Sequence, residues 1–211
     1  MKNKIKFNIT DKEVQLLTVT ILFLSLTISI LGNLEQIKQN KIALYKQEEY
    51  TELSEYKKDF VLCSEGFLSL LERTMENNEA SISKKLFEED LNLSQKLQRE
   101  GCVIDGFLEQ YSIDEQKIRD LSDIMSFTFV VAKSKMKKDK TYQDCYIISK
   151  KDLADSLNRA NDIVFKIREQ NNINFKPKKN TTLEEYRSAY LPAIEDIHHQ
   201  FDNILIKQFV N

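Results

Sequence analysis

Residues 14–34 read VQLLTVTILFLSLTISILGNL, and no charged side chain interrupts them. The run matches the about 20 apolar residues that a helix needs to cross about 30 Å of hydrocarbon. Its hydroxyl side chains fit this interpretation, because each can bond to a carbonyl oxygen one turn earlier. The sequence therefore predicts a transmembrane helix over residues 14–34. The residues expected to anchor it are Leu16, Leu17, Val19, Ile21, Leu22, Phe23, Leu24, Leu26, Ile28, Ile30 and Leu31.

A cleaved signal peptide is the alternative interpretation, since three lysines precede the apolar run at positions 2, 4 and 6. The run is longer than the about 7 to 15 apolar residues of a signal peptide. The bulky Ile30 also stands where a cleavage site near Gly32 would need a small residue. We therefore expect an uncleaved, single-pass protein of a plasma or inner membrane, with the lipid bilayer as a partner.

The lysines around this segment predict its orientation. Residues 1–13 carry four lysines, and the first 15 residues after the span carry three, Lys38, Lys41 and Lys46. Positively charged flanks favour the cytoplasmic side of a membrane. This small excess favours a cytoplasmic N-terminus and a C-terminal domain outside the cytoplasm.

The composition of the whole chain predicts helices rather than a β-rich fold. The 211 residues include only 4 glycines and 2 prolines, where average usage is about 7% and about 5%. The 31 basic and 33 acidic residues nearly balance, so we expect no nucleic-acid partner recruited by bulk charge. Cys63, Cys102 and Cys145 lack the close spacing of a zinc site, and whether any pair is bridged stays open.

Residues 34–75 carry apolar positions at helical spacing. A thin stripe comes first, formed by Leu34, Ile37, Ile42 and Leu44 among polar residues. A denser seam follows, with steps of three and four residues that are typical of a bundle or a coiled coil. The seam consists of Leu53, Tyr56, Phe60, Cys63, Phe67 and Leu70.

Four more helices are predicted. The first covers residues 81–100, the second begins after Ser112 with an inner face from Ile118 to Ala132, and the last two cover residues 151–167 and 182–209. Gly101 is expected to cap the first of them, and Ser112–Glu115 and Thr182–Glu185 are capping-box pairs. Residues 141–148 appear extended but have no evident partner strand. The expected fold is all-α: a tail (1–13), a transmembrane helix (14–34), a helical stalk (35–52) and an antiparallel bundle of four or five helices (53–211).

Few residues suggest chemistry. Glu195 and His198 lie one helical turn apart, as a carboxylate and an imidazole do in some metal sites, and they are the candidate metal ligands. The acidic run 88–90 is expected to form a solvated helix face. Two lysine clusters, at positions 133–140 and 176–179, are expected to be polar helix ends and loops. No cofactor is indicated.

Three functions fit these patterns. The leading expectation is a membrane-anchored helical bundle that works through protein contacts, as an assembly, scaffold or sensor subunit, without evident catalysis. Its expected contact residues are Leu34, Ile37 and Leu44, in a homo-oligomer or against a partner helix. The alternative is a small-molecule sensor with a pocket between helices. The third is a metal-dependent enzyme that uses Glu195 and His198.

Overall fold

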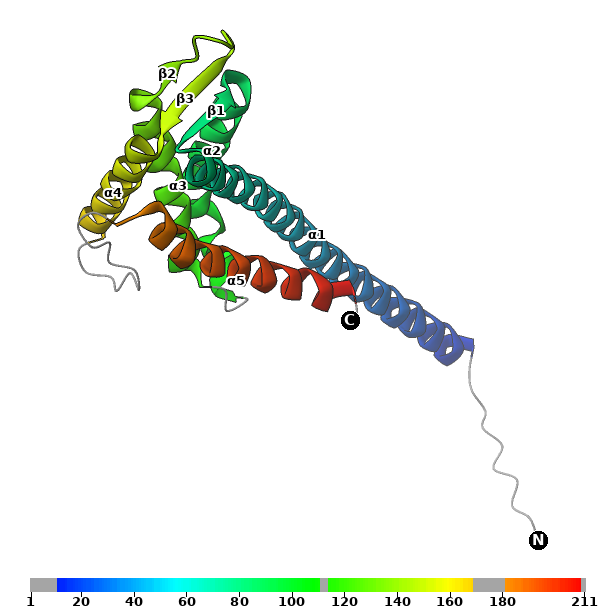
Figure 1. Cartoon of the computed structure of the whole chain (residues 1–211). Helices are drawn as coiled ribbons and strands as arrows, with labels where there is room; N and C mark the ends of the chain where they lie inside the picture. Colours follow the sequence, from blue (N-terminus) through cyan, green and yellow to red (C-terminus); the bar gives the residue numbers. More distant parts are fainter. Residues whose placement is uncertain (1–10, 111–113, 169–180, 210–211) are drawn as a thin grey trace. The chain divides into compact units, whose positions relative to one another are not determined.

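The computed structural model describes residues 11–110, 114–168 and 181–209, and for residues 13, 101–110 and 205–209 it describes the backbone alone. Five helices and three short strands make up the described chain, which confirms the predicted all-α class (Figure 1). The chain divides into two compact units, Met1–Tyr50 and Thr51–Asn211, and the division falls within the first helix.

The first unit contains the N-terminal part of helix α1, which spans Asp11–Asn77. The described side chains from Val14 to Leu44 are all exposed. The hydroxyls of Thr18, Thr20 and Thr27 each donate to the carbonyl oxygen four residues earlier at 2.8 Å, as the sequence predicted. These polar groups are therefore satisfied within the helix itself.

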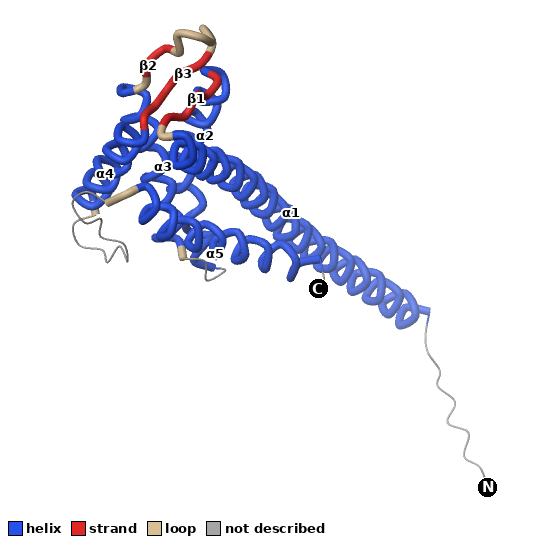
Figure 2. The backbone as a smooth tube through the Cα atoms, in the orientation of Figure 1, coloured by secondary structure: helices blue, strands red, loops and turns tan. Residues whose placement is uncertain are grey.

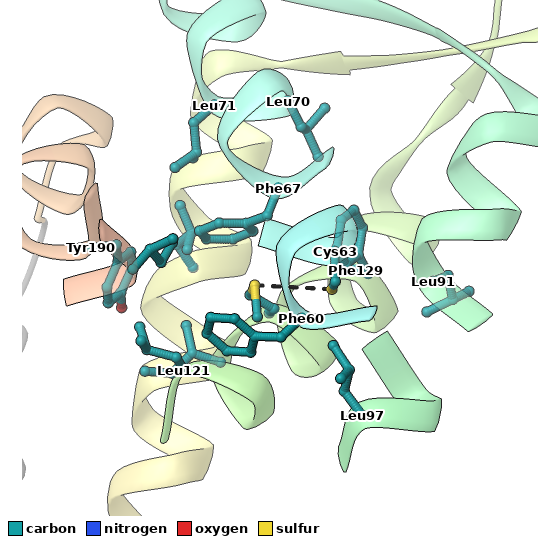
Figure 3. Close-up of a cluster of buried hydrophobic side chains, with 14 of the residues drawn as sticks. Phe60, Cys63, Phe67, Leu70, Leu71, Leu91, Leu97, Leu121, Phe129 and Tyr190 are labelled. Carbon is teal, nitrogen blue, oxygen red and sulfur yellow. Dashed lines mark hydrogen bonds between the residues drawn. The ribbon is translucent and has the colours of Figure 1, made fainter. Parts of the chain in front are cut away.

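The second unit has its core around the C-terminal part of α1. All six residues of the predicted seam, Leu53 to Leu70, are at most 2% exposed, which confirms that prediction. Figure 3 shows several of these side chains among leucines and aromatic rings from other helices. The Cys63 sulfur lies 4.0 Å from that of Met125, and burial raises the pKa of the Cys63 thiol well above its usual range.

Helix α5, Leu183–Phe209, packs against this seam in the antiparallel direction. The ring of Phe60 lies 6.1 Å from that of Phe201, and the ring of Phe67 lies 5.9 Å from that of Tyr190. The predicted capping box begins α5. The Thr182 amide donates to the Glu185 carboxylate at 2.9 Å, and the Glu185 amide donates to the Thr182 hydroxyl at 3.2 Å.

Helix α2, Lys84–Gln110, differs from the prediction at both ends. It begins later than residue 81, and its backbone continues through Gly101 instead of ending there. No glycine in the described chain has a positive φ, so none adopts the left-handed conformation of a helix cap. A glycine inside a helix costs only about 1 kcal/mol relative to alanine, which neighbouring turns can offset.

Helix α4, Lys150–Ile167, starts within one residue of the prediction, whereas helix α3, Glu115–Lys135, has its N-cap at Asp114 and not at the predicted Ser112. Asp114 caps α3 by accepting from the Lys117 amide at 3.0 Å, whereas the proposed cap Ser112 lies outside the described residues. Ser149 caps α4 by accepting from the Asp152 amide at 3.1 Å. The two helices run antiparallel.

Helix α5 also contacts α4, and there the two helices run in the same direction. The Tyr186 hydroxyl donates to Asn158 at 3.0 Å, and the Tyr190 hydroxyl donates to Asn161 at 2.7 Å. Both helices thus advance in the same direction along their contact.

A three-stranded antiparallel sheet was missed. Its order is β1 (Glu79–Ser83), β3 (Cys145–Ser149) and β2 (Lys137–Lys138), as Figure 2 shows. The extended stretch therefore has two partner strands. Asn78, with φ of 60°, ends the helical path of α1, and asparagine tolerates this conformation better than most residues. Ala80 and Ile82 of β1 are buried, while Glu79, Ser81 and Ser83 are exposed.

Candidate functional site

A groove of about 360 Å³ lies in the second unit between α1, β1 and the N-terminal half of α2. Its apolar walls are Leu62 and Leu70 on α1, Ala80 and Ile82 on β1, and Leu86 and Leu93 on α2. Leu62 and Leu86 are 46% and 44% exposed, so apolar surface continues to the rim. We call this feature the Asp90 groove, after the most buried of its carboxylates.

Asp90 belongs to the lining of the groove, and its residue is only 8% exposed. No hydrogen bond or ion pair joins its carboxylate to the part of the chain that the structure describes. Burial raises the pKa of Asp90 to about 6, and the nearby charge of Glu89 adds to that effect. The sequence prediction of a solvated acidic face was therefore wrong at this residue.

Gly66 makes room for the Asp90 carboxyl group. A Cβ atom placed on Gly66 would lie 2.7 Å from one carboxylate oxygen and 2.8 Å from the other. Real Cβ atoms essentially never approach other heavy atoms so closely. The absence of a side chain at Gly66 therefore lets α1 and α2 approach with a carboxyl group between them.

Three other charged groups line the groove. Glu65 and Arg73 come from α1, and Glu89 comes from α2. All three are exposed, in contrast to Asp90. The guanidinium of Arg73 makes no ion pair with Asp90 in the structure. The groove therefore has three carboxyl groups against one cation, which favours a positively charged ligand.

The candidate metal ligands Glu195 and His198 lie on α5. The Nε2 atom of His198 lies 3.2 Å from the Ser64 hydroxyl, and that hydroxyl donates to the Val61 carbonyl oxygen at 2.9 Å. In this arrangement Nε2–H donates to Ser64, which leaves only Nδ1 for a metal ion. Burial lowers the pKa of His198. Glu195 is exposed, and the described residues contain no group of three side chains arranged to hold a metal ion.

The lysines of the first predicted cluster are partly paired. Lys133 bonds to Glu88 at 2.8 Å, and Lys135 bonds to Asp155 at 3.4 Å. Lys137 and Lys138 form the exposed strand β2. The second cluster, at positions 176–179, lies outside the described residues.

The contact residues expected on the stalk are exposed. Leu34, Ile37 and Leu44 have exposed fractions of 57%, 52% and 55%. Nothing in the described chain packs on them. Cys63 and Cys145 are both free thiols, and the side chain of Cys102 lies outside the described residues.

Comparisons with protein-family models, curated proteins and solved structures found no match. The groove, the apolar N-terminal helix and the exposed stripe are the features of the described chain that bear on its function. Sequence reasoning missed the groove because its buried carboxylate lies within an acidic run. The helical spacing of residues 86–93 did indicate that Asp90 is buried. Asp90 falls four residues after Leu86 and three before Leu93, on the face that the apolar spacing marked as inner.

Proposed function

We propose that this chain is a single-pass membrane protein whose helical domain works through protein contacts, as an assembly, scaffold or sensor subunit. The observation that carries the proposal is the exposure of α1 in the first unit. This helix contains a stretch long and apolar enough to cross a membrane, and none of that stretch is buried by the described chain. A core helix of a soluble protein would be covered. In the proposed membrane topology, lipid surrounds the exposed apolar side chains of this stretch.

The stripe Leu34, Ile37 and Leu44 supports contact between helices beyond the span. Its steps of three and seven residues put the three side chains on one face. A helix with so thin an apolar stripe is marginal in water on its own. Copies held in one membrane meet at high effective concentration, so even a weak parallel contact becomes populated. The proposed partner is therefore a second copy of this chain.

Crosslinking tests this contact. Single cysteines at Ile37 and Leu44, in a chain whose native cysteines are replaced by alanine, should give disulfide-linked dimers or higher species in membranes. Cysteines at Gln39 and Lys46, on the polar side of the same helix, are the matched controls and should remain monomeric. Equal crosslinking at all four positions would indicate random collision, and no crosslinking at any of them would indicate a monomer; both results contradict the proposal.

We also propose that the helical domain lies outside the cytoplasm, on the basis of the lysine excess before the span. In a chain whose native cysteines are removed, a membrane-impermeant thiol reagent should then label a cysteine introduced at the exposed Lys138 in intact cells. The same chain without that cysteine is the control for background labelling. Labelling that requires lysis of the cells would place the domain in the cytoplasm.

A small-molecule sensor is the second candidate, and the Asp90 groove favours it. Ligand sites are typically apolar concavities of about 300 to 1,000 Å³ with a few polar groups, and this groove falls at the lower end of that range. Binding there would affect α1 directly, because Gly66, Leu62 and Leu70 all belong to that helix. A ligand in the groove thus contacts the same helix that carries the apolar span.

A further inference from the structure

We propose that the Asp90 groove binds a small aliphatic amine, with the ammonium group against the Asp90 carboxylate and the alkyl chain along the leucines of α1 and α2. The proposal rests on the second candidate function above and names its ligand class. The groove, the buried carboxylate and the space left by Gly66 are three separate observations that support it.

The Asp90 carboxylate determines which charge a ligand in the groove should carry. A buried carboxylate is costly unless a cation or hydrogen-bond donors accompany it. Asp90 is 8% exposed and has no such partner in the described chain. Lys85, in the first turn of α2, pairs with Glu89 at 3.8 Å, and its side chain is far more exposed than Asp90. A ligand ammonium would supply the donors and the charge that the chain itself does not.

The volume and the leucine walls of the groove limit the size and shape of the ligand. The groove volume of about 360 Å³ suits a short molecule rather than a long lipid. Leu62 and Leu70 on one helix face Leu86 and Leu93 on the other, so an unbranched alkyl chain can bury its surface between them. An anionic ligand would meet Glu65, Glu89 and Asp90 and would be repelled.

Gly66 determines where the Asp90 carboxyl group lies. Its missing side chain lets the Asp90 carboxyl group occupy the junction of α1 and α2. A methyl group there would meet the carboxyl group at 2.7 to 2.8 Å and force it to move. Gly66 is therefore a positioning residue for Asp90, and replacing it should weaken amine binding without removing any charge.

The test uses the full chain in nonionic detergent, with n-butylamine, 1-butanol and butyrate as probes in isothermal titration and thermal unfolding. Butylamine should bind at one site and raise the unfolding temperature, whereas butanol and butyrate should do neither. Asp90→Asn should weaken butylamine binding at least tenfold, and Gly66→Ala should weaken it several-fold. Asp162→Asn changes an exposed aspartate on α4 and should leave binding unchanged.

The pH dependence gives an independent readout. Butylamine affinity should fall below about pH 6, where Asp90 becomes protonated. The other charged groups that line the groove with Asp90 are Glu65 and Arg73 on α1 and the neighbouring Glu89 on α2. Because the exposed Glu65 and Glu89 could contribute to such a fall, the pH profile is compared with that of Asp90→Asn, which should be flatter.

Several results would overturn the proposal. Equal binding of butanol would show an apolar groove without recognition of charge, and full binding by Asp90→Asn would place the amine elsewhere. Tighter binding of N-acetyl-lysine methylamide than of butylamine would indicate a protein lysine as the occupant. Absence of all binding would reject the groove as an amine site, while the crosslinking of the stalk would still decide the proposed self-association.

Discussion

Arginines at both Phe23 and Leu26 are expected to release the chain from membranes. Both side chains lie near the middle of the predicted span, with exposed fractions of 70% and 59%. An arginine at the centre of a transmembrane helix costs about 2.5 to 3.5 kcal/mol on insertion scales, so the two together should cost about 5 to 7 kcal/mol. The measurement is the fraction of full-length protein that stays in the membrane pellet after a carbonate wash.

The matched control places the same charges at the ends of the span. Arginines at Gln15 and Asn33 can reach the lipid–water interface, so that variant should stay in the pellet as the unchanged chain does. If the Phe23/Leu26 variant stayed there as well, the apolar segment would not be what holds the protein to the membrane. Recovery of the intact, unchanged chain in the soluble fraction would contradict the anchor directly.

Arg168→Ala is expected to destabilise the helical domain by about 3 kcal/mol. The Arg168 guanidinium lies at the C-terminal end of α4 and pairs with Asp120 at 2.9 Å and with Asp123, both on α3. All three side chains are at most 15% exposed. Removing the cation leaves two largely buried carboxylates without a positive charge beside them, although Asp120 still accepts from the Gln116 amide at 2.8 Å. Breaking a buried ion pair costs about 3 to 5 kcal/mol, and the remaining hydrogen bond puts the expected loss at the lower end. Urea unfolding followed by circular dichroism measures the change.

Arg187→Ala is the matched control, because Arg187 pairs with Glu72 at 3.0 Å but both side chains are at least 40% exposed. Its cost should stay below about 1 kcal/mol. Burial raises the pKa of Asp120 even with Arg168 present. In Arg168→Ala, the loss should therefore shrink as the pH falls and the carboxyl groups become neutral. Equal losses in the two variants would mean that the buried pairing contributes nothing beyond a surface pair.

The helices could be predicted because their signals are long and repeated. The seam from Leu53 to Leu70 repeats its apolar step several times, and the cap residues Ser149 and Thr182 mark two helix starts chemically. The uncharged run 14–34 is recognised as a predicted transmembrane helix by its length alone. Such signals survive changes in tertiary context, because each depends on the local chain rather than on a distant partner.

The sheet could not be predicted in the same way. Strand β1 has five residues, and its alternation rests on two apolar side chains, Ala80 and Ile82. Ile82 also fitted the spacing of the following helix. The strand is defined by its pairing with β3, in which Ala80 faces Ile148 across a long sequence separation. Local periodicity carries no information about that partner.

The groove escaped prediction for a related reason. Asp90 follows Glu88 and Glu89, and an acidic run on a helix is usually solvated. In the structure Glu88 bonds to Lys133 and Glu89 is exposed, whereas Asp90 is buried against Gly66. Besides the helical phase of Asp90, the isolated Gly66 within an amphipathic helix was a hint of a close approach. Which residue approaches it depends on the packing of α2.

The packing of α5 on α1 has a consequence for synthesis. Lys57 and Asp202, which pair across these helices, are 145 residues apart. A ribosome adds about 5 to 20 residues per second, so about 7 to 30 s pass between the synthesis of the two positions. Throughout that interval the aromatic rings of Tyr56, Phe60 and Phe67 lack their cover from α5. We therefore expect that a chain whose translation stops before the last helix aggregates instead of forming a smaller folded domain.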